Sequence, residues 1–331
     1  MISNSIPGFW KDRNVFVTGG AGFVGSWLVQ QLLESGAKVT CLIRDSLHQT
    51  NFELLGLPNR VTIIDGSVED FDLVLRIINE YEIDTIFHLA AQAIVGVANK
   101  SPRATFETNI KGTWNVLEAA RQLNVQRVVI ASSDKAYGTH EQLPYTEEAR
   151  LISSHPYDVS KTCADLLAQS YHKTYGLAVA ITRCGNIFGG GDLNFNRIIP
   201  GTIRSLLLGQ APIIRSDGRY LRDYIYVKDA VRAYLQLAEN LTDPKVIGQP
   251  FNFSGGMPVS VLDLVNQLTM VSGTELPPII LNEAKNEIYS QYLSCEKART
   301  IINWQPKYTI KEGLLETFNW YKNHYFPIIT K

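Results

Sequence analysis

The stretch TGGAGFVGS, residues 18–26, decides the fold of this chain. It joins a short apolar run to the amphipathic segment 25–36, so a glycine loop lies between a predicted strand and a predicted helix. Gly19 permits the tight turn, Gly22 lets backbone approach a pyrophosphate, and Gly25 lets helix and strand pack closely. The helix N-terminus supplies free N–H groups for the phosphates. A purely structural turn is the alternative, but the strand–loop–helix context favours a dinucleotide-binding site.

Short β-branched runs alternate with helical patterns through the first half of the chain. Strands that are apolar on both faces and alternate with helices predict a parallel sheet covered on both sides. The predicted strands are 14–19, 38–43, 61–64, 85–90, 127–132 and 178–183, and the predicted helices are 25–36, 71–81, 113–123 and 155–176. The predicted fold class is therefore α/β, with a Rossmann-type doubly wound parallel sheet.

The pattern changes after Arg183. The stretch GNIFGGGDLNFNRIIPG is rich in Gly and Asn, which is typical of a loop, and proline is frequent beyond it. We therefore expect a second, smaller domain of mixed α/β structure lying over the sheet edge. The predicted division is a dinucleotide-binding domain at 1–183, with a returning segment near 224–250, and a smaller domain at 184–223 and 251–331.

Composition excludes several classes of protein. The 331 residues carry 31 Lys and Arg against 32 Asp and Glu, a net charge of −1 that favours no nucleic-acid partner. No apolar run approaches the roughly 18 residues of a membrane span, and the start MISNSIPGFWKDRN lacks a signal-peptide pattern. Four scattered cysteines without a CxxC pair fit reduced thiols better than disulfides or a zinc site. We expect a soluble cytoplasmic protein with no membrane partner and no metal.

The identity of the dinucleotide depends on the end of the second predicted strand. An acidic residue about 20 positions past the glycine loop usually binds the adenosine ribose of NAD. Here Ile43 fills the expected position and Arg44 follows it. Arg44 could meet the 2′-phosphate of NADP, stack on adenine or remain solvated. The prediction is NAD, with NADP left open.

Tyr157 and Lys161 form a Y-x-x-x-K pair at the start of the predicted helix 155–176. A spacing of four places both side chains on one helical face. A neighbouring ammonium favours the phenolate, and lowering a tyrosine pKa by ~3 units corresponds to roughly 4 kcal/mol of differential interaction. Such a pair is common on exposed helices. With the glycine loop upstream and Ser132 and Ser133 at a strand end, it indicates a catalytic site.

The segment ASSDKAYG, residues 131–138, places two hydroxyls, an acid and a base at a predicted strand end. Asp134 and Lys135 are either a solvated loop pair or a proton-handling pair. A lysine acts as a base only when it is neutral, which requires burial or a like charge, whereas a charged lysine stabilises nearby negative charge. The sequence leaves these two roles open.

These motifs resemble the extended short-chain dehydrogenase/reductase family of nucleotide-sugar enzymes over nearly the whole chain. The matching motifs are TGGAGFVG at 18–25, HLAAQ at 88–92, YDVSK at 157–161, RCGNIFGGG at 183–191 and RDYIYVKDA at 222–230. Within the family, two segments are most similar to the CDP-glucose 4,6-dehydratases. They are FWKDRNVFVTGGAGFVGSWL at 9–28 and SSDKAYG at 132–138.

The resemblance implies roles for residues at matching positions. The catalytic residues would be Ser133, Asp134, Lys135, Tyr157 and Lys161. The cofactor would be held by Gly19, Gly22, Phe23, Val24, Gly25, Arg44, Ser67, Val68, Leu89, Ala90, Ala91, Tyr157 and Lys161. A nucleotide-diphosphate sugar would contact Gln92, Asn186, Arg222 and Asn252, which makes the smaller domain substrate-binding. For Arg222 the alternative is a surface ion pair with Asp223, and the role of Asn109 would be structural.

The resemblance also implies a homodimer. The helix at 155–176 is one candidate surface, because Leu166, Leu167 and Tyr171 lie close enough along it to share an apolar stripe. The alternative is that this stripe faces the sheet of its own subunit.

The resemblance finally implies a dehydration without net redox change. Tyr157 would take the proton of the sugar 4-hydroxyl while hydride leaves C4, and Ser133 would bind the same oxygen. Asp134 would protonate the leaving hydroxyl at C6, and Lys135 would take part in deprotonation at C5. The 4-epimerases of the family typically have small or neutral residues at this pair.

The leading interpretation is therefore a nucleotide-diphosphohexose 4,6-dehydratase, with CDP-glucose as the expected substrate. A dehydratase for a UDP-, GDP- or dTDP-hexose differs only in the nucleotide pocket. A 4-epimerase or ketoreductase would keep Tyr157 and Lys161 but would not need Asp134 and Lys135. A non-catalytic dinucleotide sensor is disfavoured by the intact Tyr–Lys pair.

Overall fold

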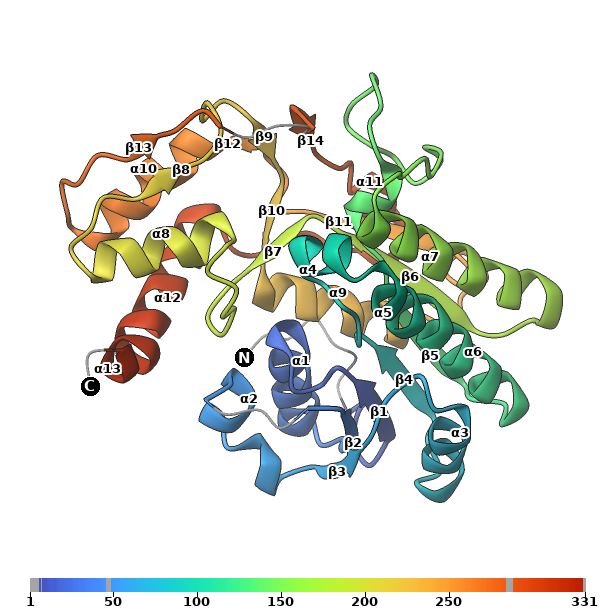
Figure 1. The fold of residues 1–331 in the computed structure, drawn as a ribbon. Helices are drawn as coiled ribbons and strands as arrows, with labels where there is room; N and C mark the ends of the chain where they lie inside the picture. Colours follow the sequence, from blue (N-terminus) through green and yellow to red (C-terminus); the bar gives the residue numbers. More distant parts are fainter. Residues whose placement is uncertain (1–5, 7, 46–48, 284–287, 330–331) are drawn as a thin grey trace.

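Seven parallel strands form the central sheet, with β4 at its middle and β1 beside it (Figure 1). The computed structural model describes residues 6, 8–45, 49–283 and 288–329. The spatial order is β3 (Thr62–Asp65), β2 (Lys38–Ile43), β1 (Asn14–Thr18), β4 (Thr85–His88), β5 (Arg127–Ala131), β6 (Val179–Cys184) and β11 (Pro250–Phe253). The order reverses between β1 and β4, which opens a crevice at the carboxyl ends of these strands. The predicted doubly wound parallel sheet is confirmed.

The sheet separates two hydrophobic cores. Successive strand side chains point to opposite faces, so Val15 and Val17 enter one core and Phe16 enters the other. Helices α1 (Phe23–Glu34), α9 (Val227–Glu239) and α11 (Glu296–Ile302) cover the first face. Helices α3 (Phe71–Glu80), α6 (Gly112–Gln122) and α7 (Pro156–Tyr175) cover the second. Each fully buried Val or Phe stabilises the fold by roughly 1.5–3 kcal/mol.

Helix α7 begins and ends where its sequence predicts. Pro156 occupies the first turn, where a missing N–H costs nothing, and Gly176 ends the helix in the left-handed region at φ +72°. The helix start therefore follows directly from the sequence, and it places Tyr157 and Lys161 in the first turns, beside the end of β5.

The smaller part of the molecule has its own apolar core, which includes Phe188, Leu264 and Leu314. Its helices are α8 (Ile198–Leu207), α10 (Val261–Ser272) and α12 (Ile310–Trp320). Its strands are β7 (Asn186–Phe188) paired with β10 (Tyr224–Tyr226), β8 (Ile213–Ile214) paired with β13 (Ile279–Ile280), and the set β12 (Val259–Ser260), β9 (Leu221–Arg222) and β14 (Ser290–Gln291). This part lies at the upper left of Figure 1.

Short helical segments connect the larger elements. They are α2 (Asn51–Leu54), η1 (Leu57–Asn59), α4 (Val95–Lys100), α5 (Pro102–Phe106), η2 (Glu107–Lys111), η3 (Asp134–Tyr137), η4 (Tyr321–Tyr325) and α13 (Phe326–Ile329). Of these, η2 is a π-helical turn between α5 and α6, and η3 carries the predicted acid–base pair.

Three features of the second half differ from the sequence-based expectations. The predicted loop after Arg183 contains strand β7, and its last residues begin helix α8, where Pro200 is tolerated because the first turn needs no backbone N–H bond. Residues 251–253, placed by prediction in the smaller domain, belong to β11 and pair with β6. Helix α11 also packs on the sheet, with Ala298 and Ile302 in the first core.

The apolar stripe predicted on α7 is divided between two environments. Leu167 and Tyr171 pack against the second core of their own sheet, whereas Leu166 is 53% exposed. In the part of the chain that the structure describes, no helix combines the length and apolar character needed to cross a membrane.

Candidate active site

The glycine loop is close-packed at the positions where the sequence places glycine. Gly19 has φ +71°, and a Cβ there would lie 2.7 Å from the backbone nitrogen of Ala90. A Cβ on Gly25 would lie 2.1 Å from the backbone oxygen of Gly19. Gly25 therefore lets α1 approach the end of β1, and Gly19 lets β1 approach the segment after β4.

The loop fits a dinucleotide pyrophosphate. Gly22 is the N-cap of α1 and offers no side-chain hydrogen bond to the first turn, which also lacks an acidic residue. The backbone N–H groups of Phe23, Val24 and Gly25 therefore need partners from outside the helix, and the helix dipole favours an anion there. The exposed Gly22 has no Cβ to block that approach.

The adenosine side of the predicted cofactor site carries Arg44, Ser67 and Val68. Arg44 donates to Asp45 from Nε at 3.1 Å and from Nη2 at 2.8 Å, and both side chains are more than half exposed. Ser67 is half-buried, and its hydroxyl accepts a bond from the backbone N–H of Glu69 at 3.3 Å. Val68 is buried, and Asn115 Nδ2 donates to its carbonyl at 3.0 Å.

A buried histidine ties β4 to the neighbouring elements. Thr18 Oγ1 lies 2.8 Å from His88 Nδ1, and Thr113 Oγ1 lies 3.0 Å from His88 Nε2. Thr113 donates its own proton to Asn109 O at 2.6 Å, so Nε2 carries the histidine proton and Thr18 donates to Nδ1. Burial first, and Lys161 second, lower the pKa of His88 to about 3. His88 is therefore a neutral structural bridge.

Asn109 carries this network to the catalytic helix, and the predicted structural role agrees with its contacts. Its Oδ1 accepts the backbone N–H of Gln92 at 2.7 Å, and its Nδ2 donates to Gln92 O at 3.2 Å and to Ser160 Oγ at 2.9 Å. Ser160 in turn donates to Tyr157 O at 2.6 Å. The loop with Leu89, Ala90, Ala91 and Gln92 is thereby held beside the start of α7.

Tyr157 and Ser133 face each other across the carboxyl end of β5. Burial raises the pKa of Tyr157 to about 12, opposed first by the positive charge of Arg197 and then by a hydrogen bond with Ser133. Arg197 itself pairs with Asp192 at 2.9 Å. The cation with the largest effect on the phenol is thus Arg197, a residue that the sequence analysis did not select.

Lys161 is anchored at the same strand end. Its Nζ donates to the carbonyl of Ala131 at 2.8 Å, and Ser132 Oγ donates to Lys161 O at 3.3 Å. Burial lowers the pKa of Lys161 to about 8. The lysine therefore loses its proton more readily than a solvated one while it remains an ammonium at neutral pH.

The acid–base pair is a partly buried ion pair. Asp134 is 2% exposed, and Lys135 Nζ lies 3.7 Å from its Oδ2. Ser133 Oγ donates to Asp134 Oδ1 at 3.1 Å. Burial raises the pKa of nearby Asp158, an effect that the charge of Lys135 opposes. This geometry is inconsistent with a fully solvated loop pair, and it brings all five predicted catalytic residues to one strand end.

A glutamine from the smaller part completes this cluster. Gln291 of β14 accepts a hydrogen bond from Lys135 Nζ and donates from Nε2 to the backbone oxygen of Asp134 at 3.1 Å. Gln291 was not predicted from the sequence, because a single glutamine in an irregular segment matches no motif.

The predicted substrate residues divide into two groups. Asn186 is half-buried and donates from Nδ2 to Asp223 O at 3.1 Å. Arg222 donates from Nη1 to Tyr289 O at 3.2 Å and lies half-exposed on β9. Asn252 is fully buried, with its side chain bonded to Tyr137 and Tyr145. The structure places Asn186 and Arg222 at accessible positions, whereas Asn252 holds β11 and is closed to a ligand.

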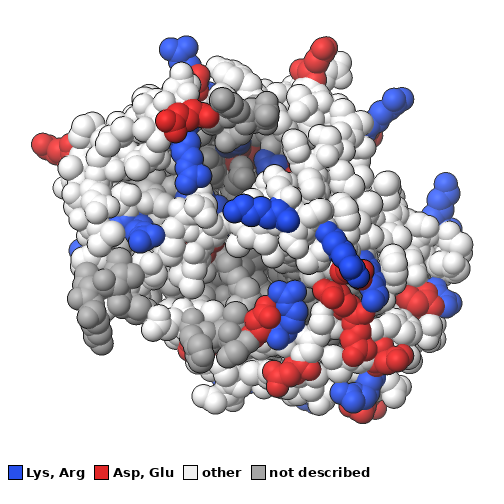
Figure 2. Space-filling view, viewed as in Figure 1, with Lys and Arg blue, Asp and Glu red and all other residues white. Residues whose placement is uncertain are grey.

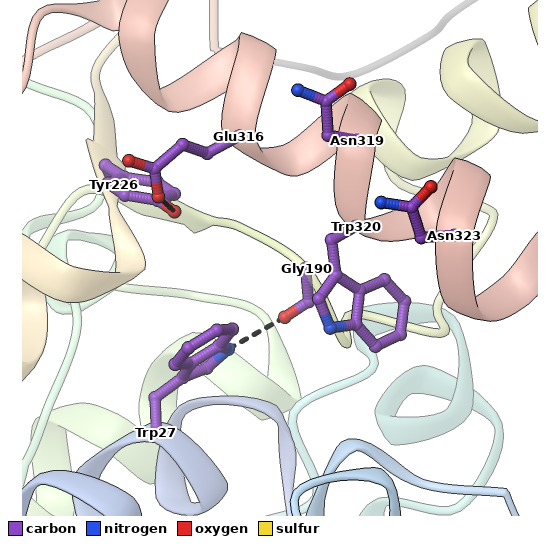
Figure 3. Close-up of a pocket in the computed structure, with 7 residues that line it drawn as sticks. All are labelled: Trp27, Gly190, Tyr226, Glu316, Asn319, Trp320 and Asn323. Atoms are coloured by element: carbon purple, nitrogen blue, oxygen red, sulfur yellow. Dashed lines mark hydrogen bonds between the residues drawn. The ribbon is translucent and has the colours of Figure 1, made fainter.

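The described residues outline a hollow on one face of the molecule and a separate pocket elsewhere. The face seen in Figure 2 is hollowed between the smaller part and the rest of the molecule, and Lys and Arg side chains border the hollow, which suits an anionic ligand. A separate pocket of about 270 Å³ lies between α1 and α12 (Figure 3). Its lining residues are Trp27, Gly190, Tyr226, Glu316, Asn319, Trp320 and Asn323, none of which belongs to the predicted site.

Known proteins resemble this chain in sequence and in structure. The sequence matches the NAD dependent epimerase/dehydratase family over residues 15–252. It is 31% identical to a CDP-glucose 4,6-dehydratase from Salmonella typhimurium, with 95% of this chain and 92% of the relative covered. It is 30% identical to a UDP-glucose 4-epimerase from Halalkalibacterium halodurans, with 94% and 96% covered. The structure of a dTDP-glucose 4,6-dehydratase from Bacillus anthracis in complex with NAD is similar, with TM-score 0.83, 27% identity and 94% and 97% covered.

Proposed function

The chain belongs to the NAD dependent epimerase/dehydratase family, and from that membership we propose that it is a nucleotide-diphosphohexose 4,6-dehydratase. Membership makes the chain an enzyme of nucleotide-sugar chemistry and confirms NAD as the cofactor. Dehydratases and epimerases resemble the chain equally well, at 31% and 30% identity. The choice between them therefore depends on the site.

The ion pair of Asp134 and Lys135 carries the proposal. A 4-epimerase needs one group that removes and returns the proton of the 4-hydroxyl, a task for Tyr157. Elimination of water needs in addition an acid at the leaving hydroxyl and a positive or basic group near C5. Asp134 and Lys135 supply these groups next to Ser133, and the low exposure of Asp134 removes it from bulk water.

The residues of the chain divide the reaction between them. NAD⁺, which the glycine loop with Gly19, Gly22 and Gly25 would hold, would supply the hydride acceptor for C4 of the sugar and the hydride donor for C6. Tyr157 takes the proton of the 4-hydroxyl, Ser133 hydrogen-bonds to the same oxygen, and the Lys161 ammonium holds the nicotinamide ribose. The resulting 4-ketone acidifies the hydrogen on C5. The Asp134 carboxylate, assisted by the positive charge of Lys135, then takes the C5 proton and delivers it to the hydroxyl that leaves C6 as water.

The substrate we propose is CDP-glucose. The segments 9–28 and 132–138 are most similar to CDP-glucose 4,6-dehydratases, and a dehydratase of that specificity is 31% identical to the chain. Arg222 and Asn186 are the residues proposed to contact the diphosphate, since a guanidinium meets phosphate oxygens with paired hydrogen bonds.

Mass spectrometry of the products tests the proposal. The purified protein is incubated separately with CDP-, dTDP-, UDP- and GDP-glucose, and we expect CDP-glucose to lose one molecule of water fastest. Faster loss from another nucleotide sugar would correct the nucleotide alone. A 4-epimer of unchanged mass, without loss of water from any substrate, would establish the epimerase instead.

The variant Asp134→Asn separates the two stages of the reaction. Oxidation at C4 should continue because Tyr157 and Lys161 remain, while elimination slows by about 10²-fold or more when a general acid is removed. Reduced cofactor should therefore accumulate on the variant. Absence of this accumulation would contradict the role given to Asp134.

We also propose that the protein forms a homodimer through the outer face of α7 and the neighbouring α6. Leu166 of α7 and Trp114 of α6 are 53% and 44% exposed on two helices that pack against each other, and exposed apolar groups favour association. Sedimentation should give twice the chain mass for the unchanged protein and a monomer for Leu166→Glu. A monomeric unchanged protein would overturn this.

A further inference from the structure

Gln291 joins the acid–base pair to the smaller part of the molecule. It is 1% exposed and lies 156 positions beyond Lys135 and 157 beyond Asp134 in the sequence. Its amide makes one hydrogen bond to each of them: Oε1 accepts from Lys135 Nζ, and Nε2 donates to Asp134 O at 3.1 Å. A buried amide with both ends bonded has one orientation.

The orientation of the Gln291 amide determines whether Lys135 donates or accepts a hydrogen bond in the absence of substrate. A backbone carbonyl only accepts hydrogen bonds, so Nε2 of Gln291 must face Asp134 O, and Oε1 must face Lys135. Lys135 is therefore held as a donor between two oxygen acceptors, the amide of Gln291 and the carboxylate of Asp134 at 3.7 Å. Both acceptors favour an ammonium.

Asp134 depends on this arrangement as well. Its Oδ2 is buried and has no hydrogen-bond partner among the described residues, so the ammonium at 3.7 Å is the nearest positive charge recorded for it. The Lys135 side chain is 24% exposed and has solvent within reach. Without the Gln291 oxygen, the lysine would sample other rotamers and leave the buried carboxylate uncompensated.

The two hydrogen bonds of Gln291, here called the clamp, come from the strand next to the one that carries Arg222. Gln291 is paired in register with Arg222 in the β14–β9 ladder, and Ser290 is paired with Leu221. The same short sheet therefore carries one residue proposed for the diphosphate and one that reaches the catalytic turn. Docking of the smaller part against the central sheet assembles both.

We propose that Gln291 is a positioning residue for water elimination, which it supports by holding the Lys135 ammonium beside Asp134. This inference rests on the proposed 4,6-dehydratase function. It assigns Lys135 the role of a fixed positive charge that stabilises the enolate formed at C5. Oxidation at C4 uses Tyr157, Ser133 and Lys161. Within the described part of the chain no hydrogen bond joins Gln291 to these three residues, so that stage does not need the clamp.

The variant Gln291→Met removes both hydrogen bonds at similar volume, and Ser290→Ala on the same strand is the control. We expect elimination to slow by about tenfold in Gln291→Met, the effect of losing one charge-assisted hydrogen bond. The rate of C4 oxidation should stay unchanged, so that reduced cofactor accumulates in single turnovers. Gln291→Glu, which keeps an oxygen toward Lys135, should restore part of the elimination rate. Equal slowing of both stages, or no slowing, would overturn the inference.

A second measurement does not require the proposed reaction. Lys135 in the full-length, NAD-loaded protein is acetylated with acetic anhydride, and its labelling rate is compared by mass spectrometry with that of exposed lysines. The rate should rise several-fold in Gln291→Met and stay unchanged in Ser290→Ala, because a released side chain is more accessible. Equal rates in all three proteins would refute the clamp. A raised rate in a protein that dehydrates no nucleotide sugar would refute the function and leave the clamp standing.

Discussion

The glycine loop and the Asp134–Lys135 turn lie at the same carboxyl edge of the sheet, but they are built differently. The close contacts of Gly25 are with Gly19 and Gly20, a few residues away. The turn instead depends on Tyr157 of α7 and on Gln291 of the smaller part. The packing of the glycine loop at Gly25 is thus determined locally, whereas the site of chemistry is assembled from segments far apart in the sequence. Substitutions in the glycine loop should therefore affect stability and NAD binding, whereas substitutions at the catalytic site should affect turnover.

The largest expected effect is on turnover at the assembled site. Tyr157→Phe removes the one hydroxyl that can take the proton of the 4-hydroxyl, and kcat should fall about 10³-fold, equivalent to roughly 4 kcal/mol. The free energy of unfolding should change little, because phenylalanine keeps the packing of the aromatic ring. Steady-state kinetics and denaturant titrations measure these quantities.

Tyr171→Phe in the same helix is the matched control. Its hydroxyl donates to Glu118 at 3.2 Å, away from the site, so its kcat should stay within about twofold of the unchanged protein. If Tyr157→Phe keeps its turnover, the chemistry does not pass through α7.

Substitutions in the glycine loop should act mainly by lowering the stability of the fold. Gly25→Ala places a Cβ 2.1 Å from Gly19 O, a backbone atom that cannot move without separating α1 from β1. We expect a loss of roughly 3 kcal/mol in the free energy of unfolding, together with loss of NAD binding. Gly22→Ala, whose Cβ would lie 3.2 Å from the same oxygen, should keep the fold and weaken NAD alone. Denaturant titrations and NAD titrations compare the two, and equal stability would break the distinction between them.

The elements that could be predicted from the sequence are those that depend on residues close together in the chain. The predicted strands and helices of the first half lie within one or two residues of those observed, since hydrophobic periodicity and the glycines at 19, 36 and 176 mark their ends. The Y-x-x-x-K pair was identified for the same reason, because both residues lie in one helix. These features are encoded within short windows of sequence.

Features that depend on distant contacts could not be predicted in this way. Arg197 and Gln291 acquire their importance from neighbours in other elements and carry no periodic signal of their own. Asn252 fits a motif position, but pairing of β11 with β6 buries it against Tyr137 and Tyr145. The assignment of residues 251–253 to the smaller domain was wrong for the same reason.

His88 bridges β1 and α6, and its lowered pKa predicts how the stability of the protein depends on pH. Its pKa is about 3 in the folded chain and about 6.5 when unfolded, so protonation below pH 6.5 favours the unfolded state. Its contribution to stability is complete above pH 6.5 and falls as pH drops toward 3, by up to roughly 1.4 kcal/mol per pH unit.

The variant His88→Gln keeps a donor and an acceptor but does not titrate. Denaturant titrations between about pH 5 and 7.5 should show a smaller loss of stability on acidification than in the unchanged protein. His324→Gln, at an exposed position, is the control and should retain the full slope. Identical slopes in all three proteins would show that His88 is not held neutral.

The smallest effect is expected on dinucleotide affinity at the adenosine end of the predicted cofactor site. There Arg44 is already bonded to Asp45. Exposed pairs of this kind contribute about 0.2–1 kcal/mol, so Arg44→Ala should change the affinity for NAD by less than about fivefold. Asp45→Ala frees the guanidinium, and the affinity for NADP relative to NAD should then rise, because a 2′-phosphate offers the arginine a new anionic partner. Titration of both dinucleotides against both variants measures the ratio. A ratio unchanged by Asp45→Ala would mean that Arg44 does not reach the ribose, and the preference for NAD would then have to arise from other residues around the end of β2.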